Sequence, residues 1–278
     1  MAQQRRLGIV DALYLRPLLQ GLDASRLFTL YPSQPAKLSM EFRERPDLLR
    51  GAFLSPLDYA RYGAEYRIVP GICVSSSSPT GTVRLYVNPG RANISTLAVD
   101  VRVTSEIILS KIVLTEKFPN LPTEKESLKF LPMEPDPKAM LARADAALVV
   151  SMTPSEPPEG LFAIDLIEEW NDMTGLPYVH GMWVGRENQM DDGEIRELLL
   201  AKQRGVAAFS RHTGSPAQDP LPAEDALRSY FLQFSYEMGE TQAESLAEFF
   251  RYAFYHGMLG DIPELNFFSP SQSDPQAN

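Results

Sequence analysis

The chain has 278 residues, 44% hydrophobic and 22% charged, which is typical of a globular protein with room for two domains. The net charge of −10 argues against a nucleic-acid partner. The sequence contains no apolar run of about 18 residues, so we expect no membrane-spanning helix. A single cysteine, Cys73, excludes an internal disulfide framework, and three scattered histidines give no zinc pattern. We therefore expect no metal and no cofactor. Because the first residues lack the apolar segment of a signal peptide, we expect a cytoplasmic protein.

The first part of the chain alternates short apolar strands with short helices. The pattern predicts strands at 7–10, 28–31 and 51–54, and helices at 17–21 and 36–45. Arg16 stands directly ahead of Pro17, a good first helical residue, and so lies at a strand-to-helix junction. Open α/β sheets place ligand groups at such junctions, although a solvated surface arginine is equally expected.

Two predicted helix starts offer hydroxyl groups and unpaired backbone N–H groups at one point. Ser55 follows a strand as an N-cap, with Asp58 in the first helical turn. Thr104 and Ser105 stand between a strand at 97–99 and a helix at 106–113. Such a start can hold a carboxylate or a phosphate. The plainer alternative is that Thr104 only caps its own helix.

Further strands are predicted between these two helix starts, at 66–69, 72–74 and 82–87. A polar turn at 75–81 separates the last two and contains four serines, among them Ser76. Their hydroxyl groups are candidate ligands for an anion, while a solvated loop is the interpretation that the composition favours.

The second half of the chain continues the alternation and then becomes helical. After a polar surface stretch at 118–127, the pattern predicts strands at 128–131 and 146–150, an extended segment at 178–183, and helices at 136–144 and 166–170. Three more helices are predicted at 191–202, at 222–239 and from 241 onward. The last carries an apolar face made of Leu246, Phe249, Phe250, Ala253 and Phe254. A polar tail, 269–278, closes the chain.

This order of elements predicts an α/β protein with two domains, each a mostly parallel sheet flanked by helices. Crossovers near 88–90 and 178–182 would divide the chain into a first domain, 1–88 plus 180–278, and a second domain, 89–179. The starts at Ser55 and at Thr104–Ser105 would then face each other across a central cleft that closes on a small ligand. Whether the chain is a monomer or a homodimer stays open.

Several motifs resemble the menaquinone-biosynthesis proteins of the futalosine pathway, that is, the chorismate dehydratases and the related dihydroxynaphthoate synthases. The main signature is Gly175-Leu-Pro-Tyr-Val, with Asp165 and Trp170 before it and Trp183 after it. Further matches lie in the Tyr14–Leu18 segment, at 54–59, 68–71 and 144–148, and at Asp100 with Thr104–Ser105. The resemblance spans about residues 7–260 and implies a two-domain, periplasmic-binding-protein-like (type II) clamshell.

The sequence departs from this family at positions that face the cleft. Arg16 stands in or beside the place of an asparagine that contacts substrate, and Leu85 replaces a serine. Ser151-Met152 takes the place of a Gly-Asp pair, which puts Met152 at the substrate, and Arg102 lies near another lost serine. These changes indicate that the protein would be a divergent member of the family.

The resemblance implies a chorismate dehydratase-type lyase that removes water from chorismate to give 3-[(1-carboxyvinyl)oxy]benzoate. Thr104 and Ser105 would hold one substrate carboxylate, Arg16 or Arg84 would pair with the other, and the general base stays unidentified. One alternative is a non-catalytic cytoplasmic protein that binds a small carboxylate and has lost the activity. A transporter's periplasmic binding component also fits the fold but lacks an export signal.

Overall fold

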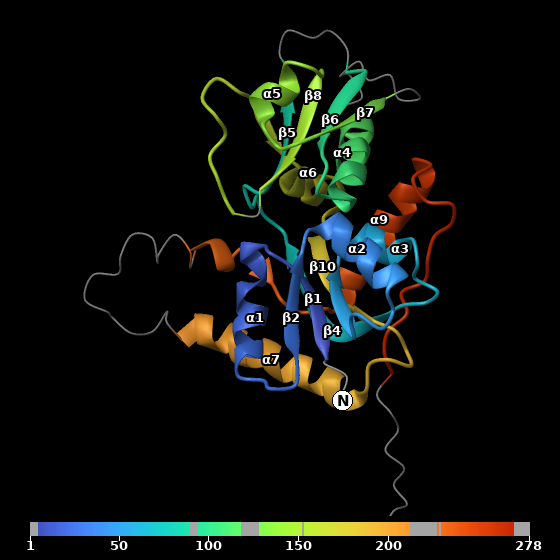
Figure 1. Cartoon of the computed structure of the whole chain (residues 1–278). Coiled ribbons are helices and arrows are strands. Elements are labelled where there is room, and N and C mark those ends of the chain that lie inside the picture. Colours follow the sequence, from blue (N-terminus) through green and yellow to red (C-terminus); the bar gives the residue numbers. More distant parts are fainter. Residues whose placement is uncertain are drawn as a thin grey trace, which may run out of the picture.

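The computed structural model describes residues 5–88, 94–117, 128–151, 153–211, 227 and 229–269. Over these residues the chain forms two α/β units, one above the other in Figure 1. The lower unit holds a sheet of strand order β11-β4-β10-β3-β1-β2, and the upper unit a sheet of order β7-β6-β8-β5-β9.

The first part of the chain forms most of the lower unit. It contains β1 (Arg6–Val10), a 3₁₀ turn (Leu13–Leu15), α1 (Arg16–Asp23), β2 (Thr29–Ser33), α2 (Pro35–Glu44), β3 (Gly51–Leu54), α3 (Pro56–Ala60) and β4 (Arg67–Ser76). Proline at the start of α1, α2 and α3 fixes where each helix begins. β4 is one long strand, where the sequence predicted two strands and then a polar turn. Ser76 is therefore a buried strand residue and not part of a solvated loop.

The upper unit follows. Its elements are β5 (Val83–Val87), β6 (Thr96–Asp100), α4 (Ser105–Glu116), β7 (Lys129–Met133), α5 (Pro137–Leu141), β8 (Ala146–Val150), β9 (Ala163–Asp165) and α6 (Leu166–Thr174). Gly175 ends α6 in the left-handed conformation, with φ +70°, which suits glycine. The predicted surface stretch at 118–127 lies outside the described residues.

The chain then returns to the lower unit through β10 (Tyr178–Gly185), α7 (Asp192–Arg211), β11 (Phe234–Ser235) and α9 (Glu240–Tyr255). β10 enters the sheet between β3 and β4 and is antiparallel to both, because it comes from the other unit. The two sheets are therefore mixed, although β1, β2 and β3 pair in parallel, as do β6, β7 and β8.

Two details differ from the prediction. β5 pairs with β8 and β9 of the upper sheet, so the chain leaves the lower sheet between 76 and 83 and not at 88–90. We accordingly propose domain boundaries within 77–82 and 175–177. The helix predicted at 222–239 is wrong over its described C-terminal part, because Phe234–Ser235 form β11 on the free edge of β4. Residues 227 and 229–231 are helical, as predicted, and residues 222–226 and 228 lie outside the described part of the chain.

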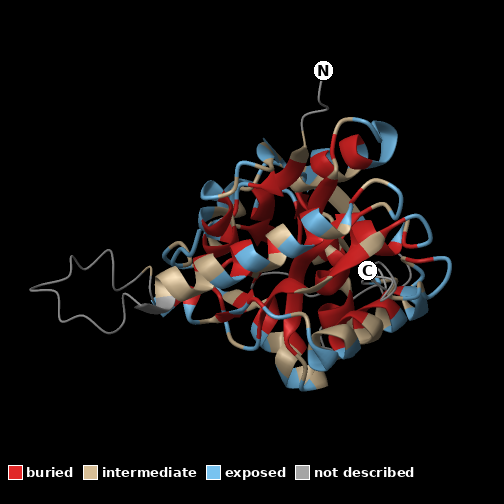
Figure 2. Cartoon of the chain, turned by 90° about the horizontal axis from the view of Figure 1, so that it is seen from below, coloured by how far each residue is buried: buried red, intermediate tan, exposed pale blue. Residues whose placement is uncertain are grey.

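The main hydrophobic core runs through both units, and a smaller cluster lies around Tyr86, Met140 and Val149 on one side of the upper sheet. Figure 2 shows buried residues along the strands and exposed residues on the outer faces of the helices. In α9, Leu246, Phe249, Phe250 and Ala253 are buried, whereas Phe254 is 38% exposed and lies off the predicted apolar face. No helix in the described ranges has the length and apolar character needed to cross a bilayer.

Candidate active site

A pocket lies between the two units, where strands of both sheets end and helices begin. The lower unit supplies Val10, Tyr14, residues at the junction of β3 and α3, and His180 from β10. The upper unit supplies Thr82 and Val83, Glu106 from the first turn of α4, and Val150–Ser151 at the end of β8. The pocket thus occupies the position that open α/β sheets use for ligands.

The pocket is narrow because the two units touch. The pocket has a volume of only about 30 Å³. Pockets that hold small molecules measure about 300–1,000 Å³, so this one is far too small for such a ligand. A ligand the size of chorismate can therefore enter only if the units move apart.

The starts of α3 and α4 meet directly at one side of the pocket. The Asp58 carboxylate accepts hydrogen bonds from the Ser55 hydroxyl at 2.6 Å and from the Thr104 hydroxyl at 2.9 Å. The Leu57 N–H donates to the Ser105 hydroxyl oxygen at 2.8 Å. We call these five residues the latch. Thr104 makes no side-chain hydrogen bond to its own helix, so the capping alternative does not describe this structure.

The latch holds a buried carboxyl group. Asp58 is 2% exposed, and this burial raises the pKa of its carboxyl group although the Ser55 and Thr104 hydroxyls favour the charged form. The latch also occupies the hydroxyl groups that the sequence nominates for a substrate carboxylate. Opening the units would release them.

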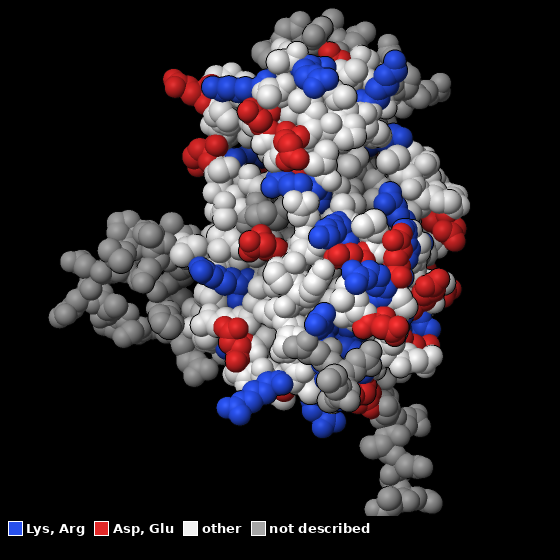
Figure 3. Space-filling view, in the orientation of Figure 1, with Lys and Arg blue, Asp and Glu red and all other residues white. Residues whose placement is uncertain are grey.

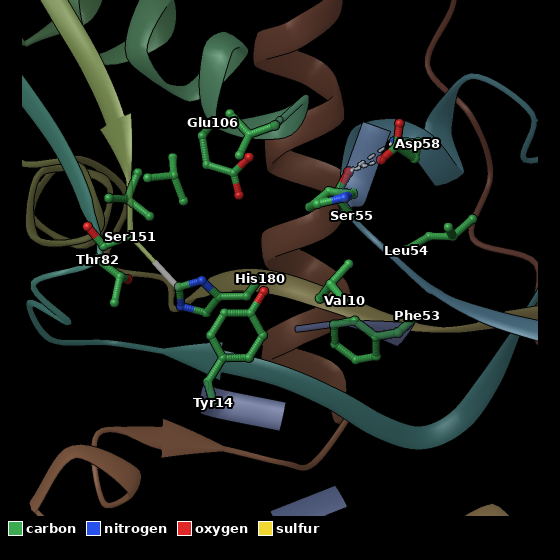
Figure 4. A pocket seen from close by; sticks show the side chains of 14 residues that line it. Val10, Tyr14, Phe53, Leu54, Ser55, Asp58, Thr82, Glu106, Ser151 and His180 are labelled. Atoms are coloured by element: carbon green, nitrogen blue, oxygen red, sulfur yellow. Dashed lines mark hydrogen bonds between the residues drawn. The ribbon is translucent and has the colours of Figure 1, made fainter. Parts of the chain in front are cut away.

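Glu106 is the pocket's second carboxyl group, and its carboxylate points into the space between the latch and His180 (Figure 4). The side chain keeps some accessible area, but this area faces the pocket and protein surrounds it. Burial raises the pKa of Glu106 from 4.5 to about 7, with smaller contributions from the charges of Asp58 and Asp100; backbone N–H groups of Glu106 and Thr104 oppose the rise. A carboxyl group with a pKa near neutral pH suits a general base or acid.

His180 lies in the wall formed by the lower sheet. Its Nε2 atom is 2.8 Å from the Ser76 hydroxyl, and its ring packs against that of Tyr14 in a tilted arrangement, with the ring centroids 5.3 Å apart. Burial lowers the pKa of His180 to about 3, so the ring is neutral at physiological pH. Ser76, a sequence candidate, thus contacts the pocket through His180 and does not line it.

The two arginines nominated by the sequence lie outside the pocket lining. Arg16 is an exposed first residue of α1, and Arg84 on β5 donates to the Ser155 hydroxyl at 3.3 Å. Arg102 is held by Asp100, with nitrogen–oxygen distances of 2.9 and 2.6 Å, and by the Val150 carbonyl. No lysine or arginine is among the described residues that line the pocket.

Leu85 and Met152 stand at two of the positions where the sequence departs from the family that it resembles. Leu85 is fully buried in the main core and is not part of the pocket lining. Met152 lies outside the described residues, while its neighbour Ser151 lines the pocket.

The signature residues shape the second crossover and not the pocket wall. Asp165 caps α6 and also accepts a hydrogen bond from the Gly81 N–H at 3.0 Å, which ties the start of α6 to the first crossover segment. Trp170 packs edge-on against Tyr178 and Phe249, and the Ser245 hydroxyl donates to the Pro177 carbonyl. The motif therefore fixes the place where the chain passes between the units.

Sequence reasoning missed Glu106, His180 and Tyr14 as pocket residues. An acidic residue in the first turn of a helix is ordinary, so nothing in the sequence separates Glu106 from a residue that only supports the helix dipole. His180 stands within a buried strand, where a histidine is usually part of the core. Tyr14 belongs to a segment that resembles the family, and this was its only signal.

The surface outside the pocket carries both signs of charge. On the face in Figure 3, acidic and basic side chains alternate and neither sign forms a continuous field. This face therefore presents no stripe of positive charge of the kind that binds nucleic acid.

Comparisons with known proteins agree with this architecture. Protein AF1704 from Archaeoglobus fulgidus has a TM-score of 0.71 at 16% identity, covering 93% of this chain and 99% of that one. The periplasmic aliphatic sulphonate binding protein SsuA from Escherichia coli has a TM-score of 0.58 at 11% identity, covering 100% and 96%. A Candida albicans protein, CA3427, described as having the generic periplasmic binding protein fold, has a TM-score of 0.57 at 9% identity, covering 93% and 91%.

At these identities the solved structures show the fold alone, and they confirm the predicted two-domain, periplasmic-binding-protein-like clamshell. The family is shown by a different comparison. A family model described as menaquinone biosynthesis matches residues 5–255, nearly the whole chain and the same region as the resemblance found in the sequence. This chain belongs to the menaquinone biosynthesis family.

Proposed function

We propose that this protein is a chorismate dehydratase-type lyase that acts in menaquinone biosynthesis. The observation that carries the proposal is Glu106, a carboxyl group that faces the pocket between the two units and has a pKa of about 7. Dehydration of chorismate needs a group that accepts a proton from the ring, and Glu106 supplies one near neutral pH.

The reaction is an elimination. Glu106 takes the proton from the ring carbon that carries the enolpyruvyl ether. The electron pair of that carbon–hydrogen bond becomes the new double bond of the ring, and the bond between the neighbouring carbon and its hydroxyl oxygen breaks. Hydroxide leaves and combines with a proton to give water. The ring becomes aromatic, which supplies the driving force.

The substrate carboxylates need partners once the units have opened. We propose that Thr104, Ser105 and the N-terminus of α4 bind one of them, because opening the latch frees these hydroxyl groups. Ser55 would bind from the facing helix. Roles for Arg16 and Arg84 stay predictions, and neither residue lines the pocket of the closed form.

A specific observation favours a second candidate, a non-catalytic protein that binds a small carboxylate. The described pocket lining combines two carboxyl groups, Asp58 and Glu106, with no lysine or arginine. This charge distribution weakens the binding of a dianion such as chorismate and suits a ligand with less charge. Structurally similar proteins include a binding protein for aliphatic sulphonates, which are also small anions.

The experiment incubates purified protein with chorismate and follows the dehydrated product by mass spectrometry. We expect product to form faster than in a protein-free control and Glu106→Gln to lower kcat by about 10²–10⁴-fold, the usual effect of losing a general base. If the wild-type protein forms no product but chorismate raises its melting temperature, the binding function is the correct one. If neither occurs, both candidates are wrong.

A further inference from the structure

His180 carries a polar atom that the closed pocket leaves without a partner. The residue is 4% exposed, and its Nε2 atom lies 2.8 Å from the Ser76 hydroxyl. The other ring nitrogen, Nδ1, has no hydrogen-bond partner within the described part of the chain. Nδ1 is not a fully buried atom, and His180 lines the pocket, so this nitrogen is open to the pocket and can form a hydrogen bond with a ligand atom there.

The ring of His180 is fixed in place by its neighbours. Besides Tyr14, it packs against Phe234 at 5.4 Å and edge-on against Tyr178 at 5.2 Å between ring centroids. Burial also lowers the pKa of His180, so the ring is neutral. A neutral imidazole has one nitrogen that donates a hydrogen bond and one that accepts. When the Ser76 hydroxyl donates to Nε2, the Nδ1 atom carries the proton and becomes the donor.

His180 and Glu106 come from different units. His180 stands on β10 of the lower sheet, and Glu106 on α4 of the upper unit. Figure 4 shows the two side chains on different walls, with the carboxylate of Glu106 directed into the space between them. A ligand that enters the open cleft would therefore contact Glu106 on one side and His180 on the other.

We propose that His180 is a catalytic residue that donates a hydrogen bond to the departing hydroxyl group of the substrate while Glu106 removes the ring proton. This inference rests on the proposed lyase function and adds the group that handles the leaving oxygen. The carbon–oxygen bond breaks with its electron pair on oxygen, and the hydrogen bond from His180 stabilises the negative charge that develops there. Glu106 then gives its proton to the hydroxide, so water forms and both side chains return to their starting states.

The test compares chorismate dehydration by the wild-type protein and by His180→Phe and His180→Asn, with affinity for the dehydrated product measured by calorimetry. Phenylalanine keeps a planar ring against Tyr14 and removes both ring nitrogens, whereas asparagine keeps a donor. Met182→Leu is the matched control, because Met182 is a fully buried β10 residue outside the pocket lining.

We expect His180→Phe to lower kcat by about 10²–10³-fold, as for the loss of one preorganised donor, while KM and product affinity change less than threefold. His180→Asn should recover part of the loss, and Met182→Leu should match the wild type. Equal kcat values for the wild type and His180→Phe would overturn the role of His180 and leave the lyase function intact. Absence of product from the wild-type protein would overturn the function and, with it, this inference.

Discussion

At the scale of single residues, the site depends on two carboxyl groups held in an environment that disfavours their charge. Burial raises the pKa of both Asp58 and Glu106, and the charge of Asp58 adds to the rise for Glu106. Hydrogen bonds from two hydroxyl groups partly offset the cost of burying the Asp58 charge, whereas the Glu106 carboxyl group faces the pocket. This difference makes Glu106 the group that is available for proton transfer.

The raised pKa of Glu106 has a consequence for stability. A carboxyl group whose pKa is higher in the folded than in the unfolded state binds its proton more tightly when folded. Its contribution is therefore complete below the unfolded value of 4.5 and is lost as pH rises to about 7. The loss is on the order of 3 kcal/mol.

We expect Glu106→Gln to remove this dependence, so that the variant loses less stability than the wild type between pH 5 and pH 8. Urea unfolding at the two pH values measures the difference. Glu159→Gln, a change in an exposed loop, is the control and should follow the wild type. A parallel loss of stability in Glu106→Gln and wild type would show that Glu106 ionises normally.

The sequence identified the hydroxyl groups at this scale but not their partners. Ser55, Thr104 and Ser105 were recognised because helix starts have a local signature. Their contact with one another joins residues about 50 positions apart, and the raised pKa of Glu106 arises from burial between two units. Neither property can be read from local sequence.

At the scale of elements, local patterns predicted most boundaries well. Pro17, Pro35, Pro56 and Pro137 mark helix starts that the structure places within one residue of the proline. The predictions that were wrong concern segments whose structure depends on pairing with a strand from elsewhere in the chain. Phe234–Ser235 form β11 only because β4 offers a free edge, and β5 joins the upper sheet only because β8 and β9 are there.

The contact between α1 and α7 depends on glycine on both helices. A Cβ atom at Gly21 would lie 1.7 Å from the Ala201 carbonyl oxygen, and one at Gly205 would lie 1.7 Å from the Pro17 carbonyl oxygen. Both neighbours are backbone atoms, which cannot move aside without separating the helices.

We expect Gly21→Ala and Gly205→Ala each to destabilise the protein by about 3 kcal/mol or more, because overpacking against backbone exceeds the gain in helix propensity of about 1 kcal/mol. Urea denaturation measures the effect. Gly260→Ala is the control, since a Cβ atom there meets nothing within 4 Å. Wild-type stability in both variants would show that the helices are not in such close contact.

At the scale of the whole molecule, the two units touch through the latch and leave between them a pocket of only about 30 Å³. We therefore expect ligand binding to require opening and closing of the two units, as in a clamshell. The Ser55 and Thr104 side-chain oxygens are 3.0 Å apart and belong to different units, so a covalent link between these positions would hold the units together.

We predict that oxidising a Ser55→Cys/Thr104→Cys variant forms a disulfide that prevents chorismate from binding, and that reduction restores binding. Calorimetry on the oxidised and reduced forms of the same variant measures this, and the reduced form is the internal control for loss of the hydroxyls. The native Cys73 is buried and should not interfere. Equal affinity in both forms would mean that ligand enters without opening.

By itself, the sequence determined the alternation of strands and helices, the two-domain clamshell, the family and the hydroxyl-rich helix starts. These follow from periodicity, capping and motifs, which act over a few residues. Only the tertiary structure decided that the crossover comes before β5, that the latch closes the cleft, and that Glu106 and His180 stand on facing walls of one pocket. These features depend on contacts between distant segments and on the removal of water from between them, which local sequence does not encode.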